Sequence, residues 1–496
     1  MTVKSDLIAS LVQYEFDNLP AKRKPVVRDN GLREWVPLSG IVAEGRDGTF
    51  TCLSLATGMK CLPSSKLSQA QGNVLHDWHA EILAIRAFNC FVLDECQALA
   101  SGSRSSSEFI RRQSKSGLDQ AQNPQDSFHW HGQPFAWRED VLLHVYCSEA
   151  PCGDASMELT MASQTDATPW AVPTTSSKGA SPSLPGSLTP APLEPEALLP
   201  GRAYFSQLGI VRRKPSRGDA PPTLSKSCSD KLSLHQCTSL LSSLTSLLVS
   251  PDHAYISTLI LPKSQYSASG CRRAFSDGRS KDEDVRETDP QLTRMAPLAT
   301  QKQIRDQNGG YSFRPFSVET TDLEFAFSRR SAALLPPSSL LSTSPSPFTT
   351  PETKTRVKIT PSNISTALTA SARLETTLNG VLQGRKASEA HIRGASFASR
   401  RRMWGSAVEI AGLLAKAEDG VDARYTRDIQ QALGISTKEE ETSDPESAAT
   451  KVKTISTYAD VKNSPLLEPR RQAKEDARRL ALKGWVRNIG DEDFVL

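Results

Sequence analysis

The chain has 496 residues with 59 basic and 55 acidic side chains, and its formal net charge of +4 excludes a histone-like polycation and an acidic tail protein. Hydrophobic residues make up 38% and aromatic residues 6%, which is below the usual globular share, and 32 prolines outnumber 28 glycines. This composition predicts an ordered core that is interrupted by polar, unstructured inserts.

The apolar stretches and the cysteines indicate the cellular compartment in which the protein is expected. The first residues lead into only a short apolar stretch, which lacks the hydrophobic region of a signal peptide. The sequence contains no run of about 18 apolar residues, so no transmembrane helix is predicted. The nine cysteines form no dense framework, which favours reduced thiols, some of them metal ligands. We therefore expect an intracellular protein of the cytoplasm, the nucleus or both, with no secretory segment and no membrane partner.

Five polar stretches, rich in serine and proline, separate the patterned parts of the chain. Such segments cannot bury enough apolar surface to offset the entropy lost on ordering them. We predict disordered inserts at 101–134, 160–200, 276–308, 331–351 and 436–449.

Hydrophobic periodicity predicts alternating strands and helices between these inserts. In chain order we predict a β-rich segment at 38–52, a helix at 80–99, a β-rich segment at 141–146, a helix at 228–249, a β-rich segment at 255–261 and helices at 400–416 and 468–483. Strands that alternate with helices indicate an α/β or α+β fold with a layered core. Because the candidate chemistry draws on segments far apart in the sequence, we expect a single catalytic domain over residues 1–496.

The first chemical motif opens the predicted helix at 80–99. His79 and Glu81 form a His-x-Glu pattern, which places an imidazole and a carboxylate within one helical turn, where both can face one pocket. The alternative is a surface histidine beside a glutamate that the positive end of the helix stabilises. This tripeptide alone does not decide between the two interpretations.

The second motif follows the predicted strand at 141–146. Pro151 cannot continue a strand ladder and Gly153 permits a tight turn, so Cys152 lies between a strand and a helix. Unpaired backbone N–H groups and the positive end of a helix lower the pKa of a thiol there toward the thiolate that metals require. The alternative is a buried structural cysteine.

The third motif places Cys228 at the start of a predicted helix. Together with His79 and Cys152 it provides one nitrogen and two thiolate ligands, whereas Glu81 need not bind a metal. Three protein ligands with an open fourth position are typical of a catalytic zinc site. His-x-Glu followed by Pro-Cys is the signature of zinc nucleobase deaminases, although here Cys152 is followed by Gly153, Asp154, Ala155 and Ser156, with no second cysteine at the spacing of that signature.

In this order, the three motifs closely resemble the adenosine-deaminase domain of RNA-editing enzymes. That family comprises the adenosine deaminases acting on RNA and the eukaryotic tRNA-specific adenosine deaminase. Segment 58–61 (GMKC) is similar to the family's Gly-Thr-Lys-Cys, with Met59 departing, and segment 212–215 (RRKP) resembles the tRNA-type enzyme. Glu81 is reached so early that no double-stranded RNA-binding domain fits before it, which also favours the tRNA type.

The resemblance implies a cytidine-deaminase-like core, a mixed sheet flanked by helices, in a fungal member of the family. It implies hydrolytic deamination of adenosine to inosine at adenosine-37, just 3′ of the anticodon, in the anticodon loop of alanine tRNA. In that reaction Glu81 is the general acid and base, and His79, Cys152 and Cys228 hold one Zn²⁺. We expect a monomer that binds no DNA.

Two basic segments, 201–231 and 470–487, each carry seven basic against two acidic residues. Such segments are either solvated surfaces or binding sites for RNA phosphates or a compact phosphate ligand. The resemblance implies a buried inositol hexakisphosphate, held at Arg86, Lys214, Lys231, Arg400, Tyr458, Lys462 and Trp485. The match is incomplete, because Ile85, Leu234 and His235 replace residues of the family's pattern and His76 replaces an asparagine.

Two other kinds of protein remain as alternatives. An RNA-binding protein with a decayed deaminase fold would bind without turnover, but the intact residues His79, Glu81, Cys152 and Cys228 argue against decay. A purely structural zinc protein would leave Glu81 without a role.

Overall fold

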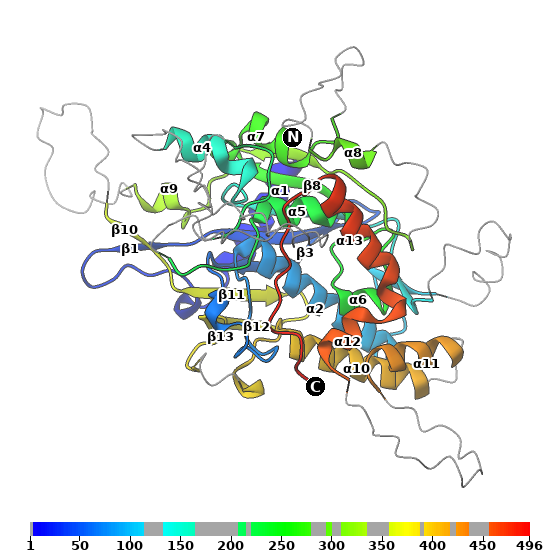
Figure 1. Ribbon diagram of the computed structural model, residues 1–496. Helices are drawn as coiled ribbons and strands as arrows, with labels where there is room; N and C mark the ends of the chain where they lie inside the picture. Colours follow the sequence, from blue (N-terminus) through cyan, green and yellow to red (C-terminus); the bar gives the residue numbers. More distant parts are fainter. Residues whose placement is uncertain are drawn as a thin grey trace, which may run out of the picture.

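The computed structural model in Figure 1 describes residues 3–113, 132–163, 207–214, 220–278, 294–299, 309–334, 357–386, 391–416, 423–435 and 456–496. The predicted insert at 436–449 and most of those at 101–134, 160–200, 276–308 and 331–351 lie outside these residues. Within the described parts of the first and third predicted inserts, short elements form, namely β4 (Ile110–Arg112) and α8 (Ala296–Ala299).

A mixed eight-stranded sheet forms the centre of the molecule. Its strand order is β13-β12-β11-β3-β2-β6-β8-β9, with β6, β8 and β9 parallel to one another and the other neighbours antiparallel. The strands are β2 (Leu38–Glu44), β3 (Phe50–Thr57), β6 (Leu142–Cys147), β8 (Ile256–Pro262), β9 (Ser317–Thr321), β11 (Ile364–Thr369), β12 (Leu374–Leu378) and β13 (Val381–Leu382). In a smaller sheet β5 (Phe135–Trp137) pairs with β4 and with β7 (Val249–Ser250), and a two-stranded sheet pairs β1 (Arg33–Trp35) with β10 (Ile359–Pro361).

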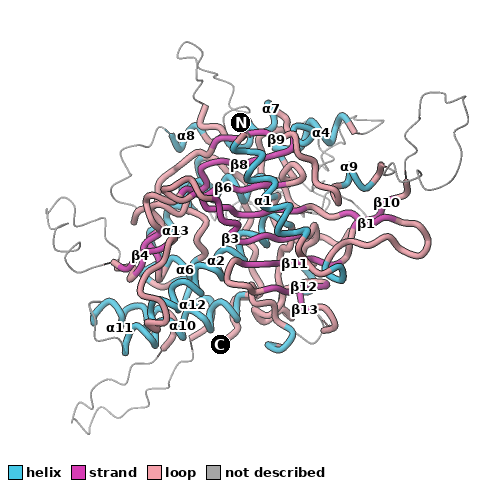
Figure 2. The backbone as a smooth tube through the Cα atoms, turned by 180° about the vertical axis from the view of Figure 1, so that it is seen from behind, coloured by secondary structure: helices cyan, strands magenta, loops and turns pink. Residues whose placement is uncertain are grey.

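Helices cover both faces of this sheet, as the predicted layered fold requires. Figure 2 shows α1 (Lys4–Asp17) lying across one face, whereas α2 (Ala80–Ala100) packs on the other. The remaining helices are α4 (Met157–Ala162), α5 (Cys228–Thr238), α6 (Ser243–Ser246), α7 (Ala268–Phe275), α9 (Arg329–Ala332), α10 (Arg400–Lys416), α11 (Ala423–Ala432), α12 (Tyr458–Asn463) and α13 (Glu468–Leu480). α10 packs against α2, and α13 packs against α5.

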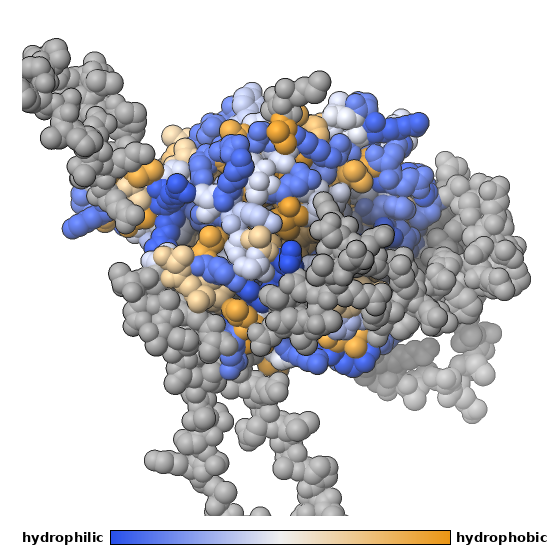
Figure 3. Space-filling model, turned by 90° about the horizontal axis from the view of Figure 1, so that it is seen from above, coloured by the Kyte–Doolittle hydropathy of each residue, from blue (hydrophilic) through white to orange (hydrophobic). Residues whose placement is uncertain are grey.

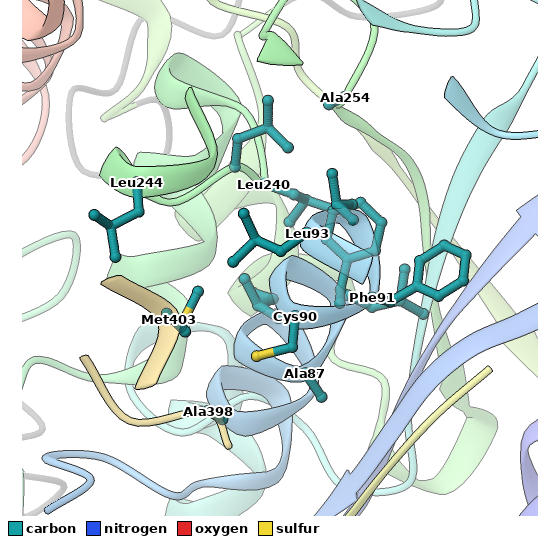
Figure 4. Packing of buried hydrophobic residues seen from close by; sticks show 14 of the residues in the cluster. Ala87, Cys90, Phe91, Leu93, Leu240, Leu244, Ala254, Ala398 and Met403 are labelled. Atoms are coloured by element: carbon teal, nitrogen blue, oxygen red, sulfur yellow. The ribbon is translucent and has the colours of Figure 1, made fainter. Parts of the chain in front are cut away.

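Side chains alternate between two hydrophobic cores because successive strand residues point to opposite faces. In β2, Val42 packs with α1, whereas Ile41 and Ala43 face the α2 side. Figure 4 shows Leu93 of α2 among residues from other elements, including Leu240. Hydrophilic side chains cover most of the described surface in Figure 3, with apolar ones scattered among them. None of the described helices combines the length and the apolar character needed to cross a bilayer.

One β-rich segment holds two strands, and one predicted helix is wrong in its extent. The β-rich segment predicted at 38–52 is confirmed and contains β2 and the start of β3, joined by a turn in which Gly45 N donates to Thr49 O at 2.9 Å. The segment 228–249, predicted as one helix, is divided because Ser239 has φ +57°, which a continuing helix does not allow. The predicted helices at 80–99, 400–416 and 468–483 are confirmed as α2, α10 and α13.

One end of the sheet brings together the segments that carry the predicted motifs. The end of β3, the start of β2 and the end of β6 lie side by side there, with Thr57 paired to Leu38 and Ser39 paired to Cys147. The chain leaves β6 into the loop that holds Cys152, and the N-termini of α2 and α5 point to the same place.

Candidate active site

Three sequence-predicted side chains meet at this end of the sheet. His79 precedes the first residue of α2, Cys152 lies in the loop after β6, and Cys228 is the first residue of α5. Their candidate ligand atoms all lie within 4.8 Å of one another, a group that could hold a metal ion. The Cys152 Sγ atom lies 3.9 Å from His79 Nδ1 and accepts a hydrogen bond from Cys228 N at 3.3 Å.

Two glycines allow the motif loops to approach this closely. Gly58 accepts a hydrogen bond from Ala80 N at 2.9 Å, and a Cβ atom built on Gly58 would lie 2.1 Å from the carbonyl oxygen of Trp78. Gly153 has φ +105°, and a Cβ atom there would lie 2.3 Å from Ser227 Oγ. Side chains at these positions would therefore push apart the segments that carry the three candidate ligands.

The two cysteines have opposite pKa shifts. The hydrogen bond from Cys228 holds the pKa of the Cys152 thiol well below its ordinary value, and the charges of Lys214 and His79 add to this against the effect of burial. Burial and the neighbouring Cys152 sulfur raise the pKa of Cys228 well above its ordinary value. The pair therefore holds one thiolate readily, and a cation bound here would displace the second proton.

Glu81 lies in the first turn of α2, and only 6% of it is exposed. Burial raises the pKa of its carboxyl above the ordinary 4.5, against the lowering effect of the neighbouring His79. A buried carboxyl with a raised pKa can both accept and return a proton near neutral pH.

Asp77 is a buried carboxylate that contacts several side chains, and sequence reasoning missed its role. Its Oδ2 atom accepts hydrogen bonds from Lys214 at 2.9 Å and from Ser225 at 2.7 Å, and it pairs with Lys231. Although burial opposes it, the two lysines hold the pKa of Asp77 well below its ordinary value. Lys214 Nζ also lies 3.2 Å from Cys228 Sγ, so Asp77 is joined to the candidate metal group through one side chain.

The sequence offered only a weak indication of the role of Asp77. Asp77 stands two residues before His79, and its Oδ1 atom accepts a hydrogen bond from His79 N at 3.0 Å. Its lysine partners are 137 and 154 residues away, so no local pattern could find them. Cys61 of the GMKC segment completes a second group with Asp77 and His79, whose candidate ligand atoms also lie within 4.8 Å of one another.

A buried ionic network joins the two cysteine motifs behind the site. Asp154 follows Cys152 by two residues, Asp230 follows Cys228 by two residues, and both carboxylates are fully buried. Arg273 Nε lies 3.3 Å from Asp154, and Arg294 Nη1 lies 2.8 Å from Asp230. Arg294 also lies 3.8 Å from Asp154, so it bridges the two motifs.

Cationic side chains of α13 gather beside Lys231 and α5. Burial holds the pKa of Lys474 well below its ordinary value, and the neighbouring positive charges add to this effect, namely those of Arg470, Lys462, Arg478 and Arg487. Burial lowers the pKa of Lys226 to about 7, and the positive charges of Lys231 and Arg478 contribute to the shift. The ring of Trp485 lies 5.6 Å from both Lys226 and Arg478. We call Lys226, Lys231, Lys474, Arg478 and Trp485 the cation cluster.

The other predicted phosphate-ligand residues make contacts within the protein. Arg400 lies 3.1 Å from the Asp491 carboxylate and 6.0 Å from the ring of Tyr458. Lys462 pairs with Glu492, and Arg86 Nε donates to a backbone carbonyl at 2.7 Å.

Asp491 also reaches the segment that precedes the candidate metal group. Its carboxylate accepts a hydrogen bond from Gly72 N at 2.8 Å and lies 2.7 Å from His76 Nε2. Gly72 has φ +68°, and a Cβ atom there would lie 2.3 Å from the ring of Phe494. The residues around 491–494 thus pack directly on the segment that leads into His79.

Comparisons with known proteins agree with this geometry. Residues 54–434 match the adenosine-deaminase (editase) domain. The "tRNA-specific adenosine deaminase 1" of Schizosaccharomyces pombe is 37% identical over 329 residues, which is 65% of this chain and 70% of that protein. The Saccharomyces cerevisiae protein of the same name is 33% identical over 248 residues, or 48% of this chain and about half (53%) of its own length. The mouse "Double-stranded RNA-specific editase B2" is 31% identical over 156 residues, 30% of this chain and 18% of that protein. The chain belongs to the adenosine-deaminase (editase) domain family, as its three motifs predicted.

Proposed function

We propose that this chain is a tRNA-specific adenosine deaminase, which converts adenosine and water to inosine and ammonia. The observation that carries the proposal is the convergence of the candidate ligand atoms of His79, Cys152 and Cys228 within 4.8 Å of one another, with the buried Glu81 in the first turn of α2, directly after His79. The names of the S. pombe and S. cerevisiae relatives support tRNA as the substrate.

The donor set fits a zinc ion. One imidazole nitrogen and two sulfurs are the ligands that Zn²⁺ takes in catalytic sites with an open fourth position. We assign His79, Cys152 and Cys228 as its ligands, and Lys214, which donates to Cys228 Sγ at 3.2 Å, steadies the thiolate charge. Zinc bound here would supply a Lewis acid that makes water nucleophilic at neutral pH.

Glu81 moves the protons of the reaction. As a carboxylate it accepts a proton from the attacking water, and as a carboxylic acid it returns protons to the adenine ring and to the leaving ammonia. Burial raises its pKa above the ordinary value, which makes the carboxylate a stronger base toward the water proton. An RNA-binding protein without turnover would not need this group buried beside the candidate ligands.

The family resemblance implies the substrate, and the cost of exposing a base is consistent with it. The target adenine must leave its stack, which costs a few kcal/mol in a duplex and less in a loop. We assign adenosine-37 in the anticodon loop of alanine tRNA as the target, acted on by a monomer in the cytoplasm or the nucleus.

The cation cluster fits a compact polyphosphate. Its side chains repel one another and are costly to bury unless they are neutralised, and the lowered pKa values of Lys474 and Lys226 express that cost. We assign inositol hexakisphosphate as a structural ligand there, held by the cation cluster together with the remaining predicted positions, namely Arg86, Lys214, Arg400, Tyr458 and Lys462. Because it binds only the folded state, such a ligand stabilises the fold.

Deamination of a tRNA transcript tests the function. Purified protein is incubated with alanine tRNA, and inosine is detected by nucleoside mass spectrometry, with a transcript carrying guanosine at position 37 as control. Glu81→Gln is expected to retain zinc and to lose about 10²- to 10⁴-fold in rate, the usual contribution of general acid–base catalysis. Inosine in the control transcript contradicts the assigned target, and a rate near that of the wild type in Glu81→Gln contradicts the assigned role.

A further inference from the structure

A small two-stranded unit stands outside the eight-stranded sheet. The strands β1 and β10 pair in parallel, and α9 packs against β1, on the left of Figure 1. We call residues 26–36, 329–334 and 357–362 the basic arm.

The basic arm is hydrogen-bonded to the loops that lead to the active site. Arg329 N donates to Glu149 Oε1 at 2.8 Å, three residues before Cys152. Pro37, which directly follows the arm, accepts a hydrogen bond from Gly58 N at 3.4 Å. The arm therefore flanks both the segment before His79 and the loop that holds Cys152.

Cations outnumber acids on this arm. Arg28, Arg33, Arg329, Arg330 and Lys358 stand against only Asp29 and Glu34. Arg329, Arg330 and Lys358 are exposed. Within the part of the chain that the structure describes, neither the Arg330 guanidinium nor the Lys358 ammonium has a hydrogen-bond or ion-pair partner. Exposed charges contribute little to stability, so the fold itself does not explain this concentration of positive charge.

Three of the guanidinium groups are held in place by the arm itself. Arg28 donates two hydrogen bonds to Glu34, at 3.0 and 2.8 Å. Arg33 donates to the backbone carbonyl of Leu334 at 2.8 Å, and Arg329 lies over the ring of Trp35 at 5.9 Å. Because these side chains are already ordered, a polyanion that binds them loses less entropy than it would on a disordered surface.

We propose that the basic arm binds the phosphodiester backbone of the RNA substrate beside the nucleotide that is deaminated. The inference rests on the proposed function, which supplies the polyanion. Guanidinium groups pair with phosphate oxygens through two parallel hydrogen bonds, and a row of them beside the site fits successive phosphates. An exposed arm suits a long polyanion that passes over the surface, whereas a compact phosphate ligand needs an enclosing site.

The test compares charge reversal on the basic arm, which adjoins the start of β2, with charge reversal in the turn that follows the end of β2. The double variant Arg330→Glu/Lys358→Glu changes the arm, and Arg46→Glu changes an exposed cation in the β2–β3 turn, at the opposite end of β2. Binding of an alanine tRNA transcript to full-length protein is measured from 50 to 200 mM salt, and kcat and KM are measured for deamination.

We expect the arm variant to bind RNA about tenfold more weakly or worse and its salt slope to fall by about two units, one for each phosphate contact removed. Its loss in kcat/KM is expected to fall mainly on KM, and Arg330→Lys/Lys358→Arg, which keeps both charges, is expected to restore binding. Wild-type affinity and salt slope in the arm variant, or an equal loss in Arg46→Glu, would overturn the proposal. A wild-type protein that binds tRNA through the arm but forms no inosine would refute the proposed function alone.

Discussion

Gly153 lies where the loop of Cys152 packs closely against Ser227, at the start of α5. The substitution Gly153→Ala tests whether this close packing sets the geometry of the candidate metal site. Its φ of +105° and ψ of −140° are close to a backbone region that essentially only glycine occupies. A Cβ atom there would lie 2.3 Å from Ser227 Oγ and 2.5 Å from Ser227 Cβ.

The expected cost has two parts. A residue held in such a backbone region costs about 1–3 kcal/mol, and forcing a methyl group into a filled space costs about 1–3 kcal/mol more. Ser227 cannot simply rotate away, because its Oγ atom caps α5 by accepting from Asp230 N at 3.1 Å. Relief of the clash therefore moves the first turn of α5, and Cys228 with it. The total of about 2–6 kcal/mol is a large share of the usual 5–15 kcal/mol for a folded domain.

Urea unfolding and elemental analysis check this prediction against a matched control. Gly48 lies in the β2–β3 turn with φ +79°, and a Cβ atom built there meets nothing within 4 Å. Gly48→Ala is therefore expected to lose only about 1–2 kcal/mol, from the backbone alone, and to retain its zinc. Gly153→Ala is expected to lose more stability and also zinc. Equal stability and equal zinc content in the two variants would refute the reasoning.

Three further predictions follow from the active site and the cation cluster. Cys228→Ala is expected to hold less than one equivalent of zinc by elemental analysis, whereas Cys96→Ala, whose thiol is equally buried, retains it; full zinc in the first variant would mean that another residue is the third ligand. Because burial raises the pKa of Glu81, the pH profile of kcat/KM is expected to fall on the acid side at a pH above the ordinary 4.5, where the carboxylate takes up its proton; an acid limb at or below 4.5 would contradict this. Denatured wild-type protein is expected to release an inositol polyphosphate, detected by anion chromatography, and Lys474→Glu to be poorly soluble because it weakens that binding; an active preparation that releases none would move these cations to the RNA-binding surface.

Local sequence patterns predicted part of the fold. The helix at 400–416 was predictable in full, because apolar residues recur along one face that packs on α2. The helix predicted at 228–249 was wrong in its extent because the leucines after Ser239 are buried although only Leu244 lies in a helix, the short α6, and burial alone does not distinguish such a segment from one long helix. Helix α1 was not predicted, although its apolar residues form the second core.

The candidate site was predictable where its chemistry is local. The three motifs led directly to His79, Cys152 and Cys228, which the fold brings within 4.8 Å. The partners of Asp77 and the bridge made by Arg294 depend on tertiary contacts between distant segments, which no periodicity or spacing encodes. The basic arm likewise joins residues near 30 to residues near 330 and 360, so the concentration of its positive charge cannot be predicted without knowing that β1 and β10 pair.

The contact between Asp491 and Gly72 spans 419 residues, and this separation sets the order in which the site can be completed during synthesis. Domains form as the chain leaves the ribosome, at about 5–20 residues per second, so the segment before His79 emerges tens of seconds before its partner. Until residue 491 has emerged, His76 and Gly72 lack the carboxylate that holds them, and Phe494 is not yet packed on Gly72. A chain that stops before residue 491 would thus carry all the candidate metal ligands and Glu81 but would lack the carboxylate that bonds to Gly72 and His76. The fold thereby makes the packing around Gly72 and His76 depend on a segment that is synthesised much later.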